Sequence, residues 1–433
     1  MKIKEIIIEG LYKKFSHHIK LNREDGITII HAPNGFGKTV ILKMLDGLIN
    51  FRLSVFQNIP FNNFKVIFDD DSYVEVIQAK TSPSRDENKR KYSINIYHKK
   101  GNENLSEPFS GYIKSDYSES LSELLKRRSE WFDVVITDVH RAQEAFERSS
   151  HALAEENLPE WYKTIRNLIQ VYFIQTQRLL LESPERKDIR LSPFTDTISQ
   201  HSRELTQIIA EKLAEFASIS QTLDRTFPKR LVENQFNPKE FSIDQLKNKL
   251  SQLEQKRIEL KAVGLIEKTE DADFQIPATL NEHSLPALSI YIKDVEQKLS
   301  VFDELAQRIK LFTTILNNRF LYKTISISKE KGFILLTDEG EELSGSDLSS
   351  GEQHELILLY EMLFKVESNS LNLIDEPEIS LHIVWQEQFL SDLEKIIALR
   401  GFDVLIATHS PQIINDRWDL TVELKGTGHE AAH

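Results

Sequence analysis

The 433-residue sequence contains no cysteine, which excludes disulfide bonds, thiolate metal sites and a cysteine nucleophile. No apolar run reaches the roughly 18 residues that a membrane-spanning helix requires. Positive charge is in the minority, because 54 Lys and Arg residues stand against 67 Asp and Glu residues, for a net charge of −13. This balance argues against a basic coat for nucleic acid or an anionic membrane, although a local basic groove remains compatible with it. We therefore expect a soluble, cytoplasmic protein without a membrane partner.

The sequence does contain enough apolar material for a large core, with 40% hydrophobic and 9% aromatic residues. Its length suits two or three units of about 150 residues, or one large domain with an insertion. Short β-like runs come first, helical patterns dominate the middle, and the end alternates apolar runs with helices, which predicts an α/β fold with a parallel sheet. The early runs predicted as strands are 6–8, 27–30, 65–68, 73–76, 93–97, 133–136 and 171–174.

The middle of the chain carries a heptad-like pattern. Apolar residues alternate at spacings of four and three through 246–260, interrupted by Arg257, and again through 288–309. Two antiparallel helices would satisfy this pattern, with the loop 262–286 as their reversal. An amphipathic helix pair packed on the core would satisfy it too, but a projecting helical arm is favoured.

The sharpest motif is 27–39, where an apolar run leads into a glycine-containing loop, Gly-Lys-Thr and an apolar helix-like segment. This is the arrangement of a P-loop, whose backbone N–H groups point at phosphates. Lys38 would neutralise the β- and γ-phosphate oxygens, and the Thr39 hydroxyl would bind Mg²⁺. Ala32 replaces the first glycine of the usual pattern and fits there with a negative φ. The residues predicted to bind ATP here are Asn34, Gly35, Phe36, Gly37, Lys38 and Thr39.

Two segments near the end of the chain suit the same chemistry. The run 371–377 reads as a buried strand that ends in Asp375 and Glu376. Asp375 would hold Mg²⁺ through water, and Glu376 would polarise the attacking water. A solvated acidic turn is disfavoured, because the apolar run leads directly into the two carboxylates. The turn 348–353 precedes an apolar helix whose amino terminus suits an anion.

Four segments, taken in chain order, resemble the Walker A, signature, Walker B and switch-histidine motifs of ABC-type ATPases: Lys38, 348–353, Asp375 with Glu376, and 404–410. The wide first gap is similar to that of the SMC, RecF and OLD class, in which an arm interrupts one nucleotide-binding head. The signature departs from the transporter form, because Leu-Ser-Ser-Gly-Glu stands in place of Leu-Ser-Gly-Gly-Gln. The resemblance implies an ABC-type head with lobe I at 1–190, a helical, coiled-coil-like arm at 191–320 and lobe II at 321–433.

The resemblance also implies a shared catalytic site. Two heads would close on ATP, so that the signature of one subunit completes the site built on Lys38 of the other. The signature residues expected at the nucleotide are Ser349, Gly351 and Glu352. His409 would contact the γ-phosphate, and 378–382 would touch the opposing subunit.

A glutamine at the edge of lobe I usually senses Mg²⁺ and water in this class. Gln175 and Gln177 follow the run 171–174, and Gln177 is preferred. The implied catalytic residues are thus Glu376, His409 and Gln177, and the implied metal-site residues are Thr39, Asp375 and Gln177. Tyr12 or Phe15 would stack on the adenine, unless either is a core aromatic. His17 and His18 read most simply as a solvated loop pair.

The compact length and short arm resemble the ATPase subunits of bacterial anti-phage defence systems such as PARIS and Septu. That resemblance implies a homo-oligomer of ATP-bridged heads that responds to a phage-derived trigger and controls a separate effector nuclease. The alternative is an ATPase of RecF or SMC type that binds DNA itself in repair or recombination. A transporter ATPase is disfavoured by the long interval between Lys38 and Ser349.

Overall fold

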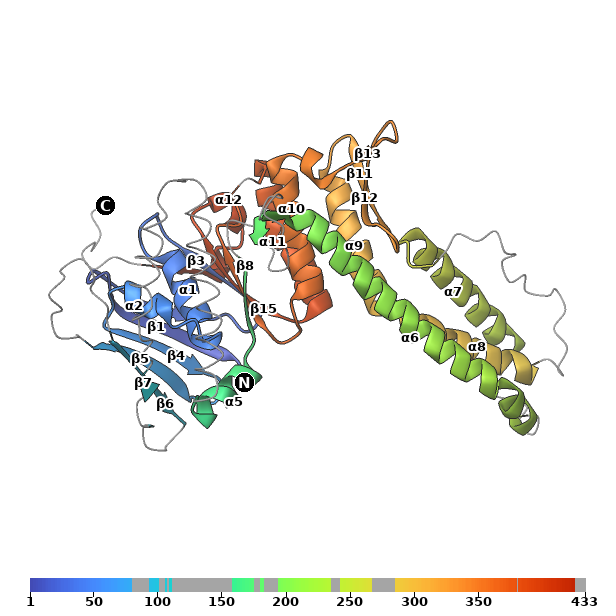
Figure 1. The fold of residues 1–433 in the computed structure, drawn as a ribbon, viewed down its shortest axis with the longest axis horizontal. Coiled ribbons are helices and arrows are strands. Elements are labelled where there is room, and N and C mark those ends of the chain that lie inside the picture. Colours follow the sequence, from blue (N-terminus) through green and yellow to red (C-terminus); the bar gives the residue numbers. More distant parts are fainter. Residues whose placement is uncertain are drawn as a thin grey trace, which may run out of the picture.

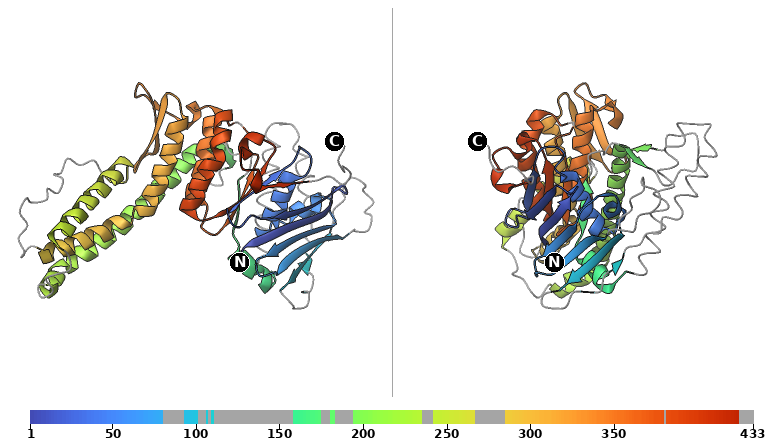
Figure 2. Two further views of the ribbon diagram at one scale, coloured as in Figure 1. Left: turned by 180° about the vertical axis from the view of Figure 1, so that it is seen from behind. Right: turned by 90° about the vertical axis from the view of Figure 1, so that its left-hand side faces the viewer.

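The computed structural model describes residues 1–79, 93–100, 106, 109–110, 158–174, 180–182, 194–234, 242–266, 285–379 and 381–424. A head built on two large sheets carries a long helical arm on one side (Figures 1 and 2). This mixed α/β head with a helical insertion confirms the predicted fold class. The strand predicted at 133–136 lies outside the described residues.

The first sheet is antiparallel and holds the early strands in the order β2-β1-β4-β5-β6-β7. Its strands are β1 (Ile3–Leu11), β2 (Phe15–Lys20), β4 (Asn63–Phe68), β5 (Tyr73–Ala79), β6 (Ser93–Lys99) and β7 (Phe109–Ser110). In β4 the side chains of Phe64, Val66 and Phe68 are buried, whereas the residues between them are partly exposed. Because every second side chain is buried, one apolar face of the sheet points toward the core.

The second sheet is parallel and combines strands from both ends of the chain in the order β16-β3-β15-β14-β8. Its strands are β3 (Ile27–His31), β8 (Val171–Ile174), β14 (Leu371–Asp375), β15 (Asp403–Thr408) and β16 (Thr421–Glu423). Every residue of β14 is buried, so both faces of the sheet are covered there. Covered faces explain why the central strands are continuous apolar runs in the sequence and do not alternate.

Helix α1 (Lys38–Ile49) packs against both sheets. Its side chains Ile41, Leu42 and Leu45 share one apolar cluster with residues of β1 and β14. A helix covered on most sides is apolar over most of its surface, and in this one Lys43 is the exposed exception. The short helices α2 (Ser54–Asn58) and α5 (Glu160–Leu168) lie beside it, and the Tyr162 hydroxyl of α5 donates to the Leu48 carbonyl. These contacts hold α1, which begins at Lys38, firmly in the core.

The remaining head elements all follow β8 in the chain. They are β9 (Leu180–Glu182), β10 (Phe194–Asp196), β11 (Lys323–Ser328), β12 (Gly332–Thr337), β13 (Glu342–Leu343), the 3-10 turns η2 (Gly345–Asp347) and η4 (Trp418–Leu420), α10 (Ser350–Tyr360), the π-helical turn η3 (Glu361–Lys365), α11 (Ile383–Arg400) and α12 (Pro411–Ile414). A buried ion pair network joins α10 and α11 to the helix that returns from the arm, because Arg319 at the end of that helix contacts both Glu355 of α10 and Asp392 of α11. Losing Arg319 would leave both buried acids without this cation, which is strongly destabilising.

The arm consists of α6 (Thr197–Asn234), α7 (Ile243–Ala262) and α8 (Leu285–Ser300), and α9 (Asp303–Arg319) returns to the head. Ion pairs define the direction of α7. Lys249 pairs with Glu296 and, farther along, Lys256 pairs with Asp303, each over 2.6 Å. Because the residue numbers of both partners increase in the same direction, α7 runs parallel to α8 and the start of α9.

Helix α6 is the antiparallel member of the arm. Asp224 pairs with Lys298 over 2.7 Å, whereas Arg230, farther along α6, pairs with the earlier residue Asp294 over 2.5 Å. The partners therefore move in opposite directions along α6 and α8. Three helices build the arm between them, with α6 leading away from the head (Figure 1).

The predicted antiparallel pair with its reversal at 262–286 is therefore wrong. Helix α7 ends beside the head, because Gly264 lies so close to β11 that a Cβ would stand 2.1 Å from the Ile327 carbonyl oxygen. The predicted seam itself is confirmed, with Leu246, Leu250, Leu253 and Leu260 all buried. A heptad pattern identifies the buried face of a helix, but the same face serves a parallel or an antiparallel partner.

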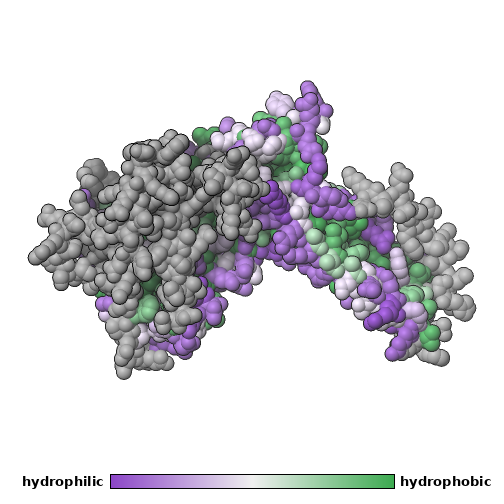
Figure 3. All heavy atoms as spheres, viewed as in Figure 1, coloured by the Kyte–Doolittle hydropathy of each residue, from purple (hydrophilic) through white to green (hydrophobic). Residues whose placement is uncertain are grey.

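The surface of the arm is largely polar. On the face drawn in Figure 3, hydrophilic side chains cover much of the arm, with apolar side chains between them. Even α6, with 38 residues, has a polar surface. Within the part of the chain that the structure describes, no helix combines the length and the apolar character needed to cross a membrane.

The seam predicts where the arm is sensitive to mutation. Leu253→Ala should lower the free energy of unfolding by about 2–5 kcal/mol, because a buried leucine leaves a cavity. The matched control is Ile258→Ala on the same helix, where the side chain is 50% exposed and Leu253 is 6% exposed; its cost should stay within about 1 kcal/mol. Urea unfolding followed by circular dichroism measures both. Equal losses in the two variants would contradict this packing.

Candidate nucleotide site

The strand order of the parallel sheet brings three sequence motifs to one edge. Strand β15 lies between β3 and β14, and all three run parallel. The segments that follow their carboxyl ends therefore meet at the edge where α/β sheets bind ligands. Lys38 follows β3, Asp375 and Glu376 stand at the end of β14, and His409 follows β15.

The loop between β3 and α1 has a backbone that requires glycine. Gly35 and Gly37 both have a φ of +90°. A Cβ on Gly37 would also stand 2.5 Å from Leu11 Cδ2, so the β1 strand end packs tightly on the loop. Ala32 is buried and has no positive φ, which confirms that alanine fits in place of the usual glycine. Asn34 and Gly35 are exposed, so the outer side of the loop is open to a ligand.

The Lys38 ammonium is held inside this loop. The side chain is 4% exposed, and its Nζ donates to the carbonyl oxygens of Ala32 at 2.6 Å and Pro33 at 3.2 Å. Burial lowers the pKa of Lys38, and the carboxylates that follow β14 oppose this shift. Hydrogen bonds from a cation to phosphate oxygens are stronger than those to neutral carbonyls, so phosphate can replace the loop carbonyls as the partner.

Thr39 and Asp375 come from opposite ends of the chain and meet at the same edge. The Thr39 hydroxyl donates to Asp375 Oδ1 over 2.9 Å. Hydroxyl and carboxylate oxygens are ligands that Mg²⁺ accepts together with water and phosphate oxygens, so this pair fits a hydrated Mg²⁺. Within the described part of the chain, no cluster of three or more His, Cys, Asp or Glu side chains offers another metal site.

Glu376 occupies a strained position directly after β14. Its φ is +45°, a left-handed value that is uncommon for any residue other than glycine. Its N–H donates to the Ala407 carbonyl over 2.8 Å, which ties the turn to β15. Backbone strain of this kind costs about 1–3 kcal/mol and is concentrated at functional sites. The partly exposed Glu376 residue thus stands at the same edge of the sheet as the P-loop, and its strained backbone costs free energy of folding.

His17 and His18 lie in strand β2, so the predicted loop is wrong, and of the two only His18 is exposed as predicted. His17 is 5% exposed, and its Nε2 lies 3.1 Å from the carbonyl oxygen of Phe36 in the P-loop. A carbonyl only accepts, so Nε2 carries the hydrogen. Burial lowers the pKa of His17 in spite of this bond, which favours the neutral ring. Phe15 packs on Phe36 with ring centroids 5.2 Å apart, while Tyr12 is 41% exposed; adenine stacking on either stays a prediction.

The signature residues form a helix cap. Ser349 is the N-cap of α10, and its N–H donates to Glu352 Oε2 over 2.8 Å while its hydroxyl accepts from the Glu352 N–H. Lys323 Nζ donates to the same carboxylate over 2.8 Å. Burial alone would raise the pKa of Glu352, but the hydrogen bonds from Lys323 and Ser349 outweigh it and leave the pKa below its usual value. The Glu352 carboxylate takes part in this cap, and its contact with nucleotide stays a prediction.

The fold does not place the signature on the P-loop of the same chain. Ser349 is exposed, and Gly351 lies in the first turn of α10 beside the base of the arm. Helix α1, which begins with Lys38, lies in a different part of the head (Figures 1 and 2). Gln177, the predicted sensor of Mg²⁺ and water, lies outside the described residues.

Three residues that support the site were missed by sequence reasoning. His17 could have been found from the alternation of apolar and polar residues in 15–20. Glu378 stands two positions after Glu376 and was assigned to a surface segment, but its side chain is 7% exposed. Lys323 carries no sequence signal, because only the folded chain brings β11 beside α10.

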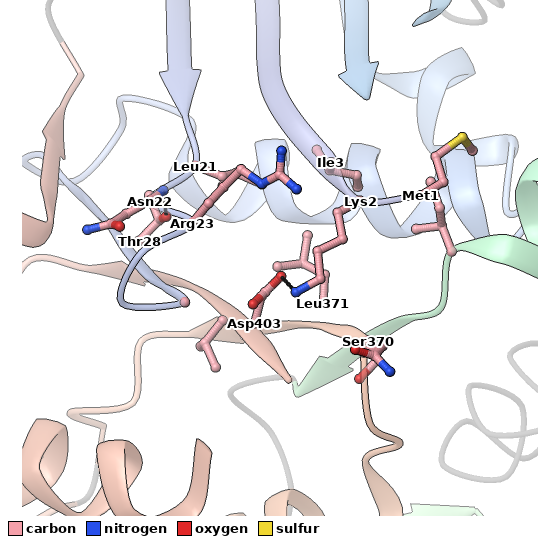
Figure 4. A pocket seen from close by; sticks show the side chains of 14 residues that line it. Met1, Lys2, Ile3, Leu21, Asn22, Arg23, Thr28, Ser370, Leu371 and Asp403 are labelled. Carbon is pink, nitrogen blue, oxygen red and sulfur yellow. Dashed lines mark hydrogen bonds and ion pairs between the residues drawn. The ribbon is translucent and has the colours of Figure 1, made fainter. Parts of the chain in front are cut away.

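A cavity of about 20 Å³ lies at the opposite edge of the parallel sheet. It is lined where β3, β14 and β15 begin, and Lys2 reaches across it to Asp403 over 2.7 Å (Figure 4). This ion pair joins the residue before β1 to the first residue of β15. The cavity lies away from the carboxyl edge and takes no part in the nucleotide site.

The fold and this constellation of residues define a P-loop ATPase. The chain belongs to the AAA ATPase domain family, whose model matches residues 1–414. Nucleotide binding and ATPase chemistry in general follow from that membership. The comparison with curated proteins gives no match.

Among solved structures, the chain is similar to the Smc head domain with an extended coiled coil from Pyrococcus furiosus, bound to the C-terminal domain of ScpA. The two share 13% identity over 95% of this chain and 90% of that chain, with a TM-score of 0.35. The SMC head domain from Thermotoga maritima is 10% identical over 96% of this chain and 93% of that chain, with a TM-score of 0.34. Likenesses this distant carry no functional argument.

Proposed function

We propose that the chain hydrolyses ATP with Mg²⁺ at the carboxyl edge of the parallel sheet. The observation that carries the proposal is the contact between Thr39 and Asp375, which are 336 positions apart and meet over 2.9 Å beside Lys38 and Glu376. A hydroxyl, a carboxylate, a buried ammonium and a second acid are the groups that phosphoryl transfer to water requires.

Each group has a separate task in this proposal. The P-loop N–H groups and Lys38 bind the phosphates, and Thr39 with Asp375 would hold Mg²⁺, which supplies charge neutralisation on the phosphate oxygens. Glu376 orients the attacking water and accepts its proton. His409 contacts the γ-phosphate from the end of β15.

The same proposal places each complete site between two heads. Ser349 and Gly351 stand at the start of α10, apart from α1 of their own chain (Figure 1). A helix amino terminus attracts anions, and Ser349 is exposed there. A second head that faces this surface with its P-loop would enclose ATP between the two, giving a homo-oligomer built from ATP-bridged pairs.

We further propose that this cytoplasmic ATPase acts in bacterial anti-phage defence and controls a separate effector nuclease. The support is the resemblance of the motifs and of the arm to the ATPase subunits of such systems. The net charge of −13 also favours a protein partner over extended contact with DNA. The trigger would be a phage-derived molecule that shifts the equilibrium between open and closed pairs of heads.

Purification from the native operon tests the partner. We expect a tagged Glu376→Gln variant with ATP bound to co-purify with a nuclease that mass spectrometry identifies. A Lys38→Ala variant should co-purify with a different amount of that nuclease. The unmodified protein is the control for expression. If the ATP-bound protein instead purifies alone and binds duplex DNA with a steep dependence on salt, the alternative RecF- or SMC-like role in repair or recombination is correct.

A further inference from the structure

Glu378 is a buried acid that the proposed chemistry does not use. It lies three residues after β14, and its side chain faces the end of the neighbouring strand β15. Its Oε1 accepts from the Thr408 hydroxyl over 2.7 Å and from the His409 N–H over 3.0 Å. The His409 ring Nδ1 lies 3.0 Å from the same oxygen. One carboxylate oxygen therefore bonds the main chain of His409 and lies within ion-pair distance of its imidazole.

The burial of the Glu378 carboxylate costs free energy of folding. Glu378 is 7% exposed, and its Oε2 is buried without a hydrogen-bond partner among the described residues. A buried carboxylate destabilises a fold unless its partners compensate. A structural bridge to Thr408 alone would need only a neutral acceptor. The charge has two partners, namely the Lys38 ammonium, whose pKa the carboxylate acts to raise, and the His409 ring, which lies in direct contact with it.

The contact also determines which nitrogen of His409 is available. A carboxylate only accepts, so Nδ1 carries the hydrogen and Nε2 is the nitrogen left for a ligand. The His409 side chain is 44% exposed, so its ring would otherwise sample several orientations. When the ring is protonated, Nε2 becomes a donor suited to a phosphate oxygen, and Glu378 compensates the charge.

We propose that Glu378 is a positioning residue that orients the His409 imidazole with Nδ1 protonated and Nε2 turned to the γ-phosphate. The phosphate contact rests on the proposed ATPase function, whereas orientation and tautomer do not. The pairing links the segment after β14 to the residue after β15.

Nuclear magnetic resonance of ¹⁵N-histidine-labelled protein tests the tautomer without nucleotide. The His409→Gln variant identifies the His409 signals by their absence. In the unmodified protein the neutral ring should be protonated on Nδ1, and Glu378→Ala should lose this signature. Identical His409 ring signals in the unmodified protein and Glu378→Ala would overturn the proposal.

Steady-state ATPase kinetics test the consequence. Both Glu378→Ala and Glu378→Gln should lower kcat by about 10- to 100-fold with little change in KM, as when the hydrogen-bond partner of a functional histidine is removed. Glu378→Gln keeps an acceptor for Thr408 and therefore guards against misfolding, and Glu387→Gln, an exposed acid on α11, controls for lost charge. A kcat within twofold of the unmodified protein in both Glu378 variants would overturn the positioning role. If the unmodified protein shows no turnover, the proposed function fails and the ring signals still decide the tautomer.

Discussion

Replacement of Lys38 by alanine is expected to abolish nucleotide binding, whereas Glu376→Gln is expected to keep ATP bound and lose turnover. Lys38 pairs with phosphate charge in both the ground state and the transition state, so its loss weakens binding throughout the reaction. Glu376 acts on water in the chemical step alone, and its loss should lower kcat by about 10²- to 10⁴-fold. Fluorescent-ATP titration and phosphate release measure the two effects.

The matched control for the first variant lies on the same helix. Lys43 is an exposed residue of α1, and Lys43→Ala should bind and hydrolyse ATP normally. Equal turnover by Glu376→Gln and the unmodified protein would remove Glu376 from catalysis. In that case the strain at its backbone, with φ at +45°, would need another explanation.

Ser349→Arg is expected to leave ATP binding intact and to prevent hydrolysis. The long cation would stand where the γ-phosphate of the partner head is proposed to lie, while Lys38 of the same chain is untouched. Loss of the α10 cap itself costs only about 1 kcal/mol. Ser344→Arg controls for that cost, because Ser344 is also an exposed serine in a capping box of the same lobe. Its hydrolysis rate should be nearly unchanged.

Mixing tests whether the sites are shared. Ser349→Arg keeps an intact Lys38 surface, and Lys38→Ala keeps an intact Ser349 surface. An equal mixture should recover about one quarter of the unmodified rate, since half of the randomly formed pairs contain one subunit of each kind and one intact site of two. Mixed pairs that form, as shown by two affinity tags, yet recover no activity would place the whole site within one chain.

The candidate nucleotide site follows largely from the sequence. A P-loop depends on local chemistry, namely glycines that accept positive φ and a lysine at the start of an apolar helix, so 27–39 could be recognised directly. The acids after the run 371–375 were equally readable, because a strand buried on both faces is a continuous apolar run. The seam of the arm was visible for the same reason, since it depends on spacing within one helix.

Tertiary structure alone decided which partner each of these segments meets. The heptads of α7 and α8 are compatible with either direction, and the pairs of Lys249 and Lys256 show that the helices are parallel. Glu352 could be placed in the signature turn from the sequence, but only the folded chain shows that Lys323 from β11 pairs with its carboxylate. Glu378 was read as surface, because no local pattern reveals that β14 and β15 become neighbours. Periodicity in the sequence shows which side of a helix or strand is buried. Which residues pack against that side depends on contacts between residues far apart in the chain.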